Sequence, residues 1–480
     1  MHARPGQLVE EQQWSGAGVA RRFLALGAGE AGARLLAFAG MVHVARAVGP
    51  DGFGAIGFAL AVLLYMSRLA DGGLDLGAGV GEVAARRDAP GAFVPAVLTI
   101  RALLALGVAA VTATAALLLL PVPDGHILAL YAAVLVVAGL STRWVHVGMD
   151  RARTVGGARL LGEALVLTLL VTLVHRPGDV LRVPLAQLAG DAAAALLLLV
   201  ALRQAGVPLR PRLDPAAALP VLRRGWRLMG ATLLGLAIYN SDLLFLRALH
   251  GTASVGLYAA AYAIVSFWLN IGVTYALSLL PAVSARADDP HRHALRERAL
   301  AHAVALWTPV MAGGAIVAPG LVGLVFGPGY EPAGAALRLL IWSMLPAVLA
   351  EVVLAGLVAM RRERSVVRVY ATTLAITLVL NAALIPRFGI VGAAVATIGG
   401  ELARLALAVR AAGAAGYGPL EPTRWWRAMV AGGAMAATLL ALGPLPVLVA
   451  VGVGAVTYVA ALTAMGGIRF RRGALPVLSP

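Results

Sequence analysis

The chain contains 480 residues, of which 60% are hydrophobic and only 13% are charged, and its mean hydropathy is +0.86. Soluble domains carry about a quarter charged residues, so this composition excludes a soluble enzyme and indicates a protein that meets lipid. The formal net charge of +16 comes from arginines spread over many short loops, which argues against a nucleic-acid-binding face. The absence of cysteine excludes disulfides and thiolate metal sites.

Long apolar runs dominate the sequence. In a bilayer every backbone polar group must bond within the protein, and these runs are continuous and do not alternate with polar residues, so they predict helices. With about 20 apolar residues needed per crossing, we expect about fourteen transmembrane helices. In chain order they cover residues 23–47, 53–70, 93–120, 127–147, 160–174, 183–202, 228–249, 255–280, 300–326, 337–358, 369–385, 390–409, 428–442 and 445–465.

Arginine placement supports this number of helices independently, because cytoplasmic loops of membrane proteins carry an excess of basic residues. With both termini in the cytoplasm, the loops on that side hold most of the arginines, and Arg404 is grouped with them. The opposite loops hold only Arg46, Arg176, Arg182, Arg247, Arg338 and Arg387. A miscounted helix would invert this pattern, so we predict a multi-pass protein of the inner membrane with both termini cytoplasmic.

The chain also resembles itself at an offset of about 200 residues, an internal repeat of the kind that builds transporter lobes. Residues 46–61 parallel residues 247–263, and residues 149–153 parallel residues 360–364. The predicted fold is therefore all-α, with two six-helix lobes related by a pseudo-twofold axis along the membrane normal and two extra C-terminal helices. The predicted parts are a cytoplasmic segment 1–22, an N-lobe 23–203, a cytoplasmic linker 204–227, a C-lobe 228–410, and the extra helices and tail 411–480.

Two stretches carry a resemblance to a known family. The residues ARAVGPDGFGAIGFALAV at 45–62 and LNAALIPRFGIVGAAVAT at 380–397 are similar to the signatures of polysaccharide-transport (Wzx-type) flippases. These belong to the multidrug/oligosaccharidyl-lipid/polysaccharide exporter superfamily, and the resemblance extends from residue 23 to about residue 410. It implies translocation of a lipid-linked oligosaccharide to the periplasmic leaflet, through a hydrophilic cavity that two lobes open alternately to each side.

Ionisable residues inside the predicted helices are the candidate site residues, because a charge at mid-bilayer costs about 2.5–3.5 kcal/mol. Arg34 is a candidate for binding the substrate's pyrophosphate, and Glu30, four residues earlier, either pairs with it or binds a coupling cation. Arg101 is a second substrate candidate, with snorkelling to the membrane surface as the alternative. Asn240 is the third candidate for substrate binding.

Asp242 is the leading candidate for proton or sodium coupling, since its own helix offers no ionic partner. Asp191 and Glu351 lie deep in predicted helices and are further ion-coupling candidates. The alternative for each of them is a protonated or structurally paired carboxylate. For Glu401, Arg404 three residues later favours a local pair, and we expect Asn381 to form an interhelical hydrogen bond.

The leading hypothesis is a flippase for a polyprenyl-pyrophosphate-linked oligosaccharide, working by alternating access with H+ or Na+ exchange as a possible driving force. Membrane lipids and a polysaccharide polymerase are the expected partners; no cofactor, metal or nucleic acid is expected. A multidrug or peptidoglycan-precursor transporter of the same superfamily is the alternative. A membrane-embedded acyl- or glycosyltransferase is disfavoured, because the loops are too short to hold a catalytic domain. We expect no enzymatic activity.

Overall fold

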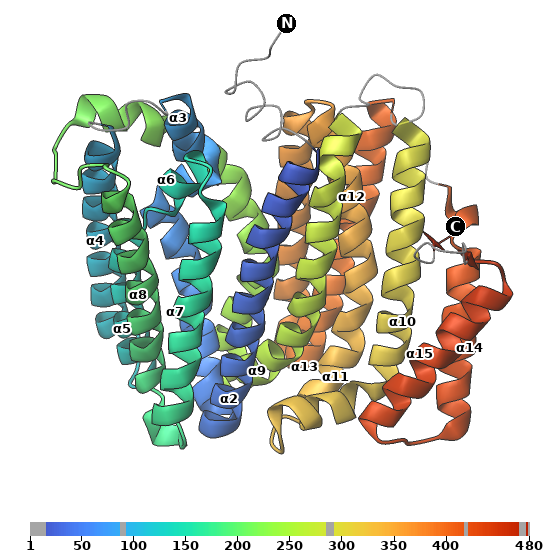
Figure 1. Cartoon of the computed structure of the whole chain (residues 1–480). Helices are drawn as coiled ribbons and strands as arrows, with labels where there is room; N and C mark the ends of the chain where they lie inside the picture. The colour runs from blue at the N-terminus through green and yellow to red at the C-terminus, as the bar shows by residue number, and fades with distance from the viewer. Residues whose placement is uncertain (1–15, 87–92, 285–291, 417–420, 470–476, 479–480) are drawn as a thin grey trace, which may run out of the picture. The chain divides into compact units, whose positions relative to one another are not determined.

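A computed structural model of the chain describes residues 16–86, 93–284, 292–416, 421–469 and 477–478 (Figure 1). Almost all regular structure in these residues is helical. The exceptions are two antiparallel strands of two residues each, β1 (Ile468–Arg469) and β2 (Val477–Leu478). The all-α membrane fold predicted from the sequence is confirmed.

Ten segments of the described chain are long and apolar enough to cross a bilayer. Three of the helices involved, α2 (Gly16–Asp71), α9 (Pro215–Ser284) and α13 (Glu363–Ala414), have 56, 70 and 52 residues. One crossing needs only about 20 residues, so each of these helices is long enough for two. A shorter apolar helix, α14 (Trp426–Leu442), adds a further candidate. The protein is therefore multi-pass, while the number fourteen stays a prediction.

Each of the three long helices is interrupted at one glycine. The backbone of Gly49 in α2, Gly251 in α9 and Gly389 in α13 has φ values of 73°, 80° and 54°. Glycine adopts positive φ without the steric cost that a Cβ would bring. Pro50 follows the first break and Pro386 precedes the third. These breaks fall between the helices predicted in pairs from the sequence, and they divide each long helix into two arms.

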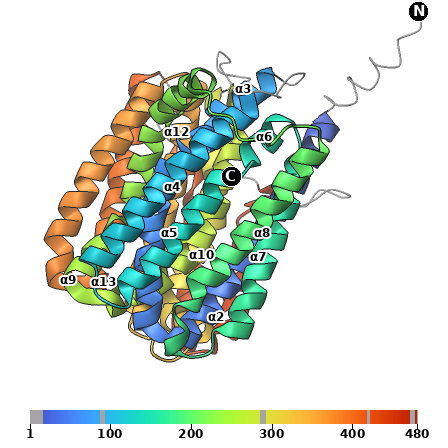
Figure 2. The same ribbon diagram turned by 90° about the vertical axis from the view of Figure 1, so that its left-hand side faces the viewer.

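The chain forms two compact units, residues 1–233 and 234–480. Besides α2 and the start of α9, the first unit contains η1 (Leu74–Ala78), α3 (Gly79–Ala85), α4 (Phe93–Leu119), α5 (Asp124–Leu140), α6 (Arg143–Gly148), α7 (Ala152–Leu173), η2 (Pro177–Asp179) and α8 (Arg182–Gln204). Helices α4, α5, α7 and α8 run side by side, and the short α3 and α6 lie together at one end of them (Figures 1 and 2).

Small residues bring the helices of the first unit close together. Gly162 of α7 faces Gly190 of α8, and a Cβ on Gly190 would lie 2.7 Å from the Gly162 carbonyl oxygen and closer still to Val166. Helix packing in membranes depends on such close backbone approach, because lipid supplies no hydrophobic driving force between helices.

We therefore expect Gly190→Val to lower the melting temperature of the purified protein, with a destabilisation of about 1–3 kcal/mol from overpacking. Intrinsic tryptophan fluorescence during heating would measure it. Gly107→Val in α4 is the matched control, because a Cβ there meets no atom within 4 Å. Equal losses for both variants would show that only helix propensity had changed.

The second unit contains the rest of α9, together with α13 and α14, which were introduced above, and six further helices of the described chain. These are α10 (Arg292–Phe326), α11 (Ala333–Leu340), η3 (Ile341–Ser343), α12 (Met344–Ala359), η4 (Pro422–Arg424) and α15 (Val447–Ala464). Helices α14 and α15 correspond to the extra C-terminal pair predicted from the sequence, and both pack on α10. The Tyr458 hydroxyl of α15 donates to the Ala305 carbonyl of α10 at 2.7 Å.

Local features recur in the two units at matching positions. Asp150 and Arg361 are the residues other than glycine that have positive φ in the described chain, at 61° and 55°. Each is the second residue of the predicted repeat motif and lies in a turn that precedes a long helix, α7 or α13. At the same offset, the carbonyl oxygens of Val174 and Ile385 each meet a histidine Nε2 atom, at 2.9 and 2.8 Å. The matching geometry supports the internal repeat.

Candidate functional site

Asp242 lies in the first arm of α9 and is only 3% exposed. The Tyr258 hydroxyl donates to its Oδ2 atom at 2.5 Å, and the Thr397 hydroxyl approaches the same oxygen at 3.5 Å. The backbone N–H of Leu243 donates to Oδ1 at 2.8 Å. Within the described chain no arginine or histidine forms an ion pair with this carboxylate. Asp242 is therefore held by neutral donors alone.

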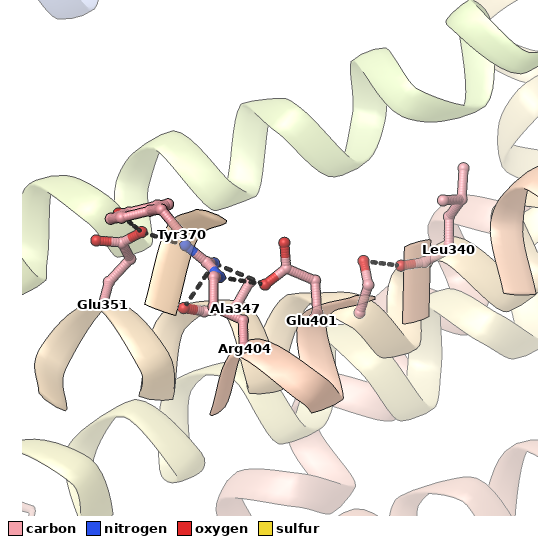
Figure 3. A network of polar contacts seen from close by, with 7 residues as sticks. Leu340, Ala347, Glu351, Tyr370, Glu401 and Arg404 are labelled. Carbon is pink, nitrogen blue, oxygen red and sulfur yellow. Dashed lines mark hydrogen bonds and ion pairs between the residues drawn. The ribbon is translucent and has the colours of Figure 1, made fainter. Parts of the chain in front are cut away.

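A second buried network is centred on Arg404 in the second arm of α13, whose side chain is fully buried (Figure 3). Its Nε and Nη2 atoms lie 2.8 and 2.6 Å from Oε2 of Glu401, one turn earlier on the same arm. Its Nη1 atom donates to Oε1 of Glu351 on α12 at 2.5 Å, and the Tyr370 hydroxyl donates to that same oxygen at 3.2 Å. The network therefore ties α12 to both arms of α13 (Figure 3).

The pair of Glu401 and Arg404 predicted from the sequence is confirmed. The grouping of Arg404 with the cytoplasmic loop arginines is wrong, because α13 continues past it to Ala414 and the protein encloses the guanidinium. A buried arginine is tolerated there because carboxylates and a carbonyl oxygen accept its hydrogen bonds.

A small cavity lies between the two networks, with about 10 Å³ of space, which is room for roughly one water molecule. Its walls come from α9 and α13 and consist of Ile238, Tyr239, Asp242, Tyr262, Thr377, Thr397, Gly400 and Glu401. Asp242 and Glu401 thus face one space from two separate hydrogen-bonded groups. The two networks together contain one guanidinium, that of Arg404, and three carboxyl groups, those of Asp242, Glu351 and Glu401. When all of these groups are ionised, negative charge is in excess.

Oxygen atoms without a hydrogen-bond partner lie along the first arm of α13. Thr373, Thr377 and Asn381 are buried and follow one another at four-residue spacing, so they share one helix face. The hydroxyl oxygens of the two threonines and the amide oxygen of Asn381 make no hydrogen bond in the described structure. Thr377 also lines the cavity. Oxygen donors of this kind suit hard cations, although no cluster of three or more acidic or histidine ligands occurs in the described chain.

The second family-like motif, residues 380–397, supplies much of this arrangement. The Asn381 amide donates to the Ser241 hydroxyl at 3.1 Å, which confirms the interhelical hydrogen bond predicted for it. The Ile385 carbonyl meets the His250 ring at 2.8 Å, and Thr397 approaches Asp242. The motif therefore holds the break of α13 against α9, and this contact positions Asp242 at the cavity.

Other predicted site residues lie outside this cluster. Arg34 is exposed on the first arm of α2, and the side chain of Glu30 lies outside the described part of the structure, so their pairing is not tested. Asn240 is half-buried, and its amide donates to the Leu236 carbonyl of its own helix at 3.1 Å. Asp191 in α8 accepts a hydrogen bond from Gln187 at 3.1 Å.

Arg101 is only 2% exposed and takes part in an ion-pair network within the first unit. Its Nη2 atom lies 2.9 Å from Asp71 and 3.6 Å from Asp75, and its Nη1 atom donates to the Ser141 carbonyl at 2.9 Å. This burial in protein contradicts the alternative that Arg101 snorkels to the membrane surface. Its role in substrate binding stays a prediction.

Sequence reasoning did not single out Tyr258 or Thr397, and it missed both the burial of Arg404 and its contact with Glu351. Signals for the first two were present, because Tyr258 lies in the repeated stretch 247–263 and Thr397 ends the second motif. Arg404 falls within the predicted helix 390–409, where an arginine is expensive unless it is paired.

Known proteins provide an independent comparison. A family model described as polysaccharide biosynthesis protein matches residues 19–286, and one described as lipid II flippase MurJ matches residues 160–467. AglR of Haloferax volcanii, described as a probable flippase, is 28% identical over 177 residues. That match covers 35% of this chain and 37% of AglR.

Solved structures share the fold at low identity. The lipid II flippase MurJ in an inward closed conformation superposes with a TM-score of 0.74 at 11% identity, covering 92% of this chain and 98% of that one. An inward-facing multidrug resistance MATE family transporter gives 0.65 at 16% identity, covering 80% and 95%. Because each family model matches more than half of the chain, the protein belongs to the polysaccharide biosynthesis protein and lipid II flippase MurJ families.

Proposed function

We propose that the protein is a flippase that moves a polyprenyl-pyrophosphate-linked oligosaccharide across the inner membrane by alternating access, and that a cation or proton bound at Asp242 drives it. The observation that carries the ion site is a buried carboxylate with no arginine partner in the described chain, beside a cavity of about 10 Å³. Family membership and the description of AglR as a probable flippase support lipid translocation.

Charge balance favours exchange at Asp242. One guanidinium cannot neutralise three carboxylates, and an uncompensated charge in a dry interior costs several kcal/mol, on the order of the desolvation penalty for an ion. A proton or Na+ at Asp242 removes part of that excess. The hydroxyl of Thr397 and the unpaired oxygen of Thr377 face the same cavity, so ligands for a hard cation are within the cluster. Loading and release of the ion would then change the stability of the α9–α13 contact.

Arg34 is the residue we assign to the substrate's pyrophosphate, since a guanidinium can give two parallel hydrogen bonds to phosphate oxygens. Arg34→Ala should reduce surface polysaccharide export in the host at least tenfold, while its abundance in the membrane stays constant. Quantitative immunoblotting and extraction of the polysaccharide would measure both. Arg46→Ala, an exposed arginine on the same arm of α2, is the matched control. Normal export by Arg34→Ala would remove Arg34 from the site.

Transport of a peptidoglycan precursor is the second candidate, and the match to the MurJ family over residues 160–467 favours it. The two candidates separate in a strain that can be depleted of its own lipid II flippase. Growth restored by this chain would assign the peptidoglycan precursor. Lysis of the depleted strain, together with restored export in a strain that lacks an oligosaccharide flippase, would assign the saccharide lipid.

Location in the inner membrane, with both termini cytoplasmic, belongs to the same proposal and rests on the arginine distribution. A polysaccharide polymerase would be the partner that consumes the translocated lipid. Reporter fusions at residue 480 and in the loop before Asp124 would test the orientation, since the proposal requires opposite compartments for these two positions.

A further inference from the structure

The segment between α8 and the membrane arm of α9 packs tightly on the first unit. Ala218, Val221 and Leu222 are buried at helical spacing, and Gly225 continues the same face. They join a core cluster with side chains of η1, α3 and α6, namely Leu74, Ala78, Val83, Trp144 and Val145. A Cβ on Gly225 would collide with the Gly72 carbonyl oxygen, so the backbones are in direct contact. The inner face of this segment is therefore buried against the first unit.

The outer face of the same segment combines apolar and basic side chains. Leu213, Leu219 and Trp226 are 72%, 44% and 45% exposed. Leu219, Arg223 and Trp226 follow one another at helical spacing, so they lie on one face. The exposed arginines are Arg203 in the last turn of α8 and Arg210, Arg212, Arg223 and Arg224 in the segment itself. Arg212 pairs with Asp214 at 3.2 Å and Arg224 with Glu82 at 3.5 Å, while Arg203, Arg210 and Arg223 form no ion pair within the described chain.

We propose that this outer face, called the linker surface, binds the headgroups of anionic phospholipids. It consists of Arg203, Arg210, Arg212, Leu213, Leu219, Arg223 and Trp226. A helix that shows tryptophan and leucine beside arginine is typical of one lying in the membrane interface, where the rings and aliphatic chains enter the acyl boundary and the guanidinium groups meet phosphate. Charge complementarity selects anionic over zwitterionic lipid, and each arginine at such a surface contributes about fivefold in affinity.

The position of the linker surface agrees with this assignment. It belongs to the end of the first unit that carries α3 and α6 (Figure 2), and the arginine distribution assigns that end to the cytoplasmic leaflet. Lipid bound there would hold the start of α9 at the membrane surface. The proposal does not depend on which molecule the protein transports.

The test uses the full-length protein in detergent, titrated with short-chain phosphatidylglycerol or phosphatidylcholine carrying a dansyl group, with energy transfer from tryptophan as the signal. We expect wild-type protein to bind phosphatidylglycerol at least tenfold more tightly than phosphatidylcholine. The triple variant Arg210→Gln, Arg212→Gln and Arg223→Gln should lose that preference, and Trp226→Phe should reduce the transfer signal.

The matched control is the triple variant Arg362→Gln, Arg364→Gln and Arg368→Gln, which removes three exposed arginines from another loop predicted to be cytoplasmic. It should keep the wild-type preference, and equal melting temperatures should verify folding of both variants. If both triple variants lost the preference for phosphatidylglycerol equally, the preference would depend only on the net charge of the protein, and the proposal would be overturned. An unchanged preference in the linker variant would also overturn it. Competition by millimolar inorganic phosphate would identify a free-phosphate site instead and would also overturn it.

Discussion

Replacing Arg404 with methionine is expected to destabilise the protein by about 3–5 kcal/mol, the usual cost of breaking a buried ion pair by removing one partner. Arg404 is fully buried, and its change leaves Glu401 and Glu351 without a cationic partner in the described chain. Methionine keeps much of the length and the apolar stem of the side chain, so the loss of stability measures mainly the effect of removing the charge. Thermal unfolding followed by intrinsic tryptophan fluorescence in detergent would measure it.

Second-site changes separate charge from packing at Arg404. Adding Glu401→Gln and Glu351→Gln to Arg404→Met removes the stranded carboxylates, so much of the lost stability should return. Arg404→Lys should recover less, because an ammonium cannot reproduce the fork that contacts Glu401 and Glu351 together. A melting temperature of Arg404→Met equal to wild type would contradict the assigned network.

Replacing Asp242 with asparagine is expected to abolish the dependence of transport on a proton or sodium gradient while the protein still folds. Asparagine has nearly the same shape and can still accept from Tyr258, but it cannot exchange a charge. Uptake or export should fall at least tenfold under an imposed gradient and should no longer respond to its size. Proteoliposomes with a defined gradient of H+ or Na+ would show which ion is used.

Asp191→Asn serves as the comparison, because Asp191 is another predicted ion-coupling carboxylate and lies in the first unit. Its contact with Gln187 on the same helix is local, and Asp191 is not among the residues that line the cavity beside Asp242. A preserved gradient response in Asp191→Asn, with loss in Asp242→Asn, is the expected pattern. The reverse pattern would move the ion site to the first unit and end the proposal for Asp242.

Local signals in the sequence were sufficient for the membrane class and for much of the helix layout. Apolar runs predict spanning helices because lipid leaves backbone groups no partner outside the helix. The breaks at Gly49, Gly251 and Gly389 lie between predicted helices, since glycine there accommodates positive φ. The Glu401–Arg404 pair was also predictable, because residues three apart on a helix face each other.

Contacts between distant residues were decided only by the tertiary structure. The hydroxyls of Tyr258 and Thr397 reach Asp242 from 16 and 155 residues away, and Glu351 reaches Arg404 across 53 residues. Arg101 likewise meets Asp71 from another helix. Helical periodicity records which face of a helix a residue occupies, but it carries no information about which other helix packs there. The sequence by itself therefore determined a multi-pass helical protein with buried charges, whereas helix packing decided that Asp242 and Glu401 share one cavity.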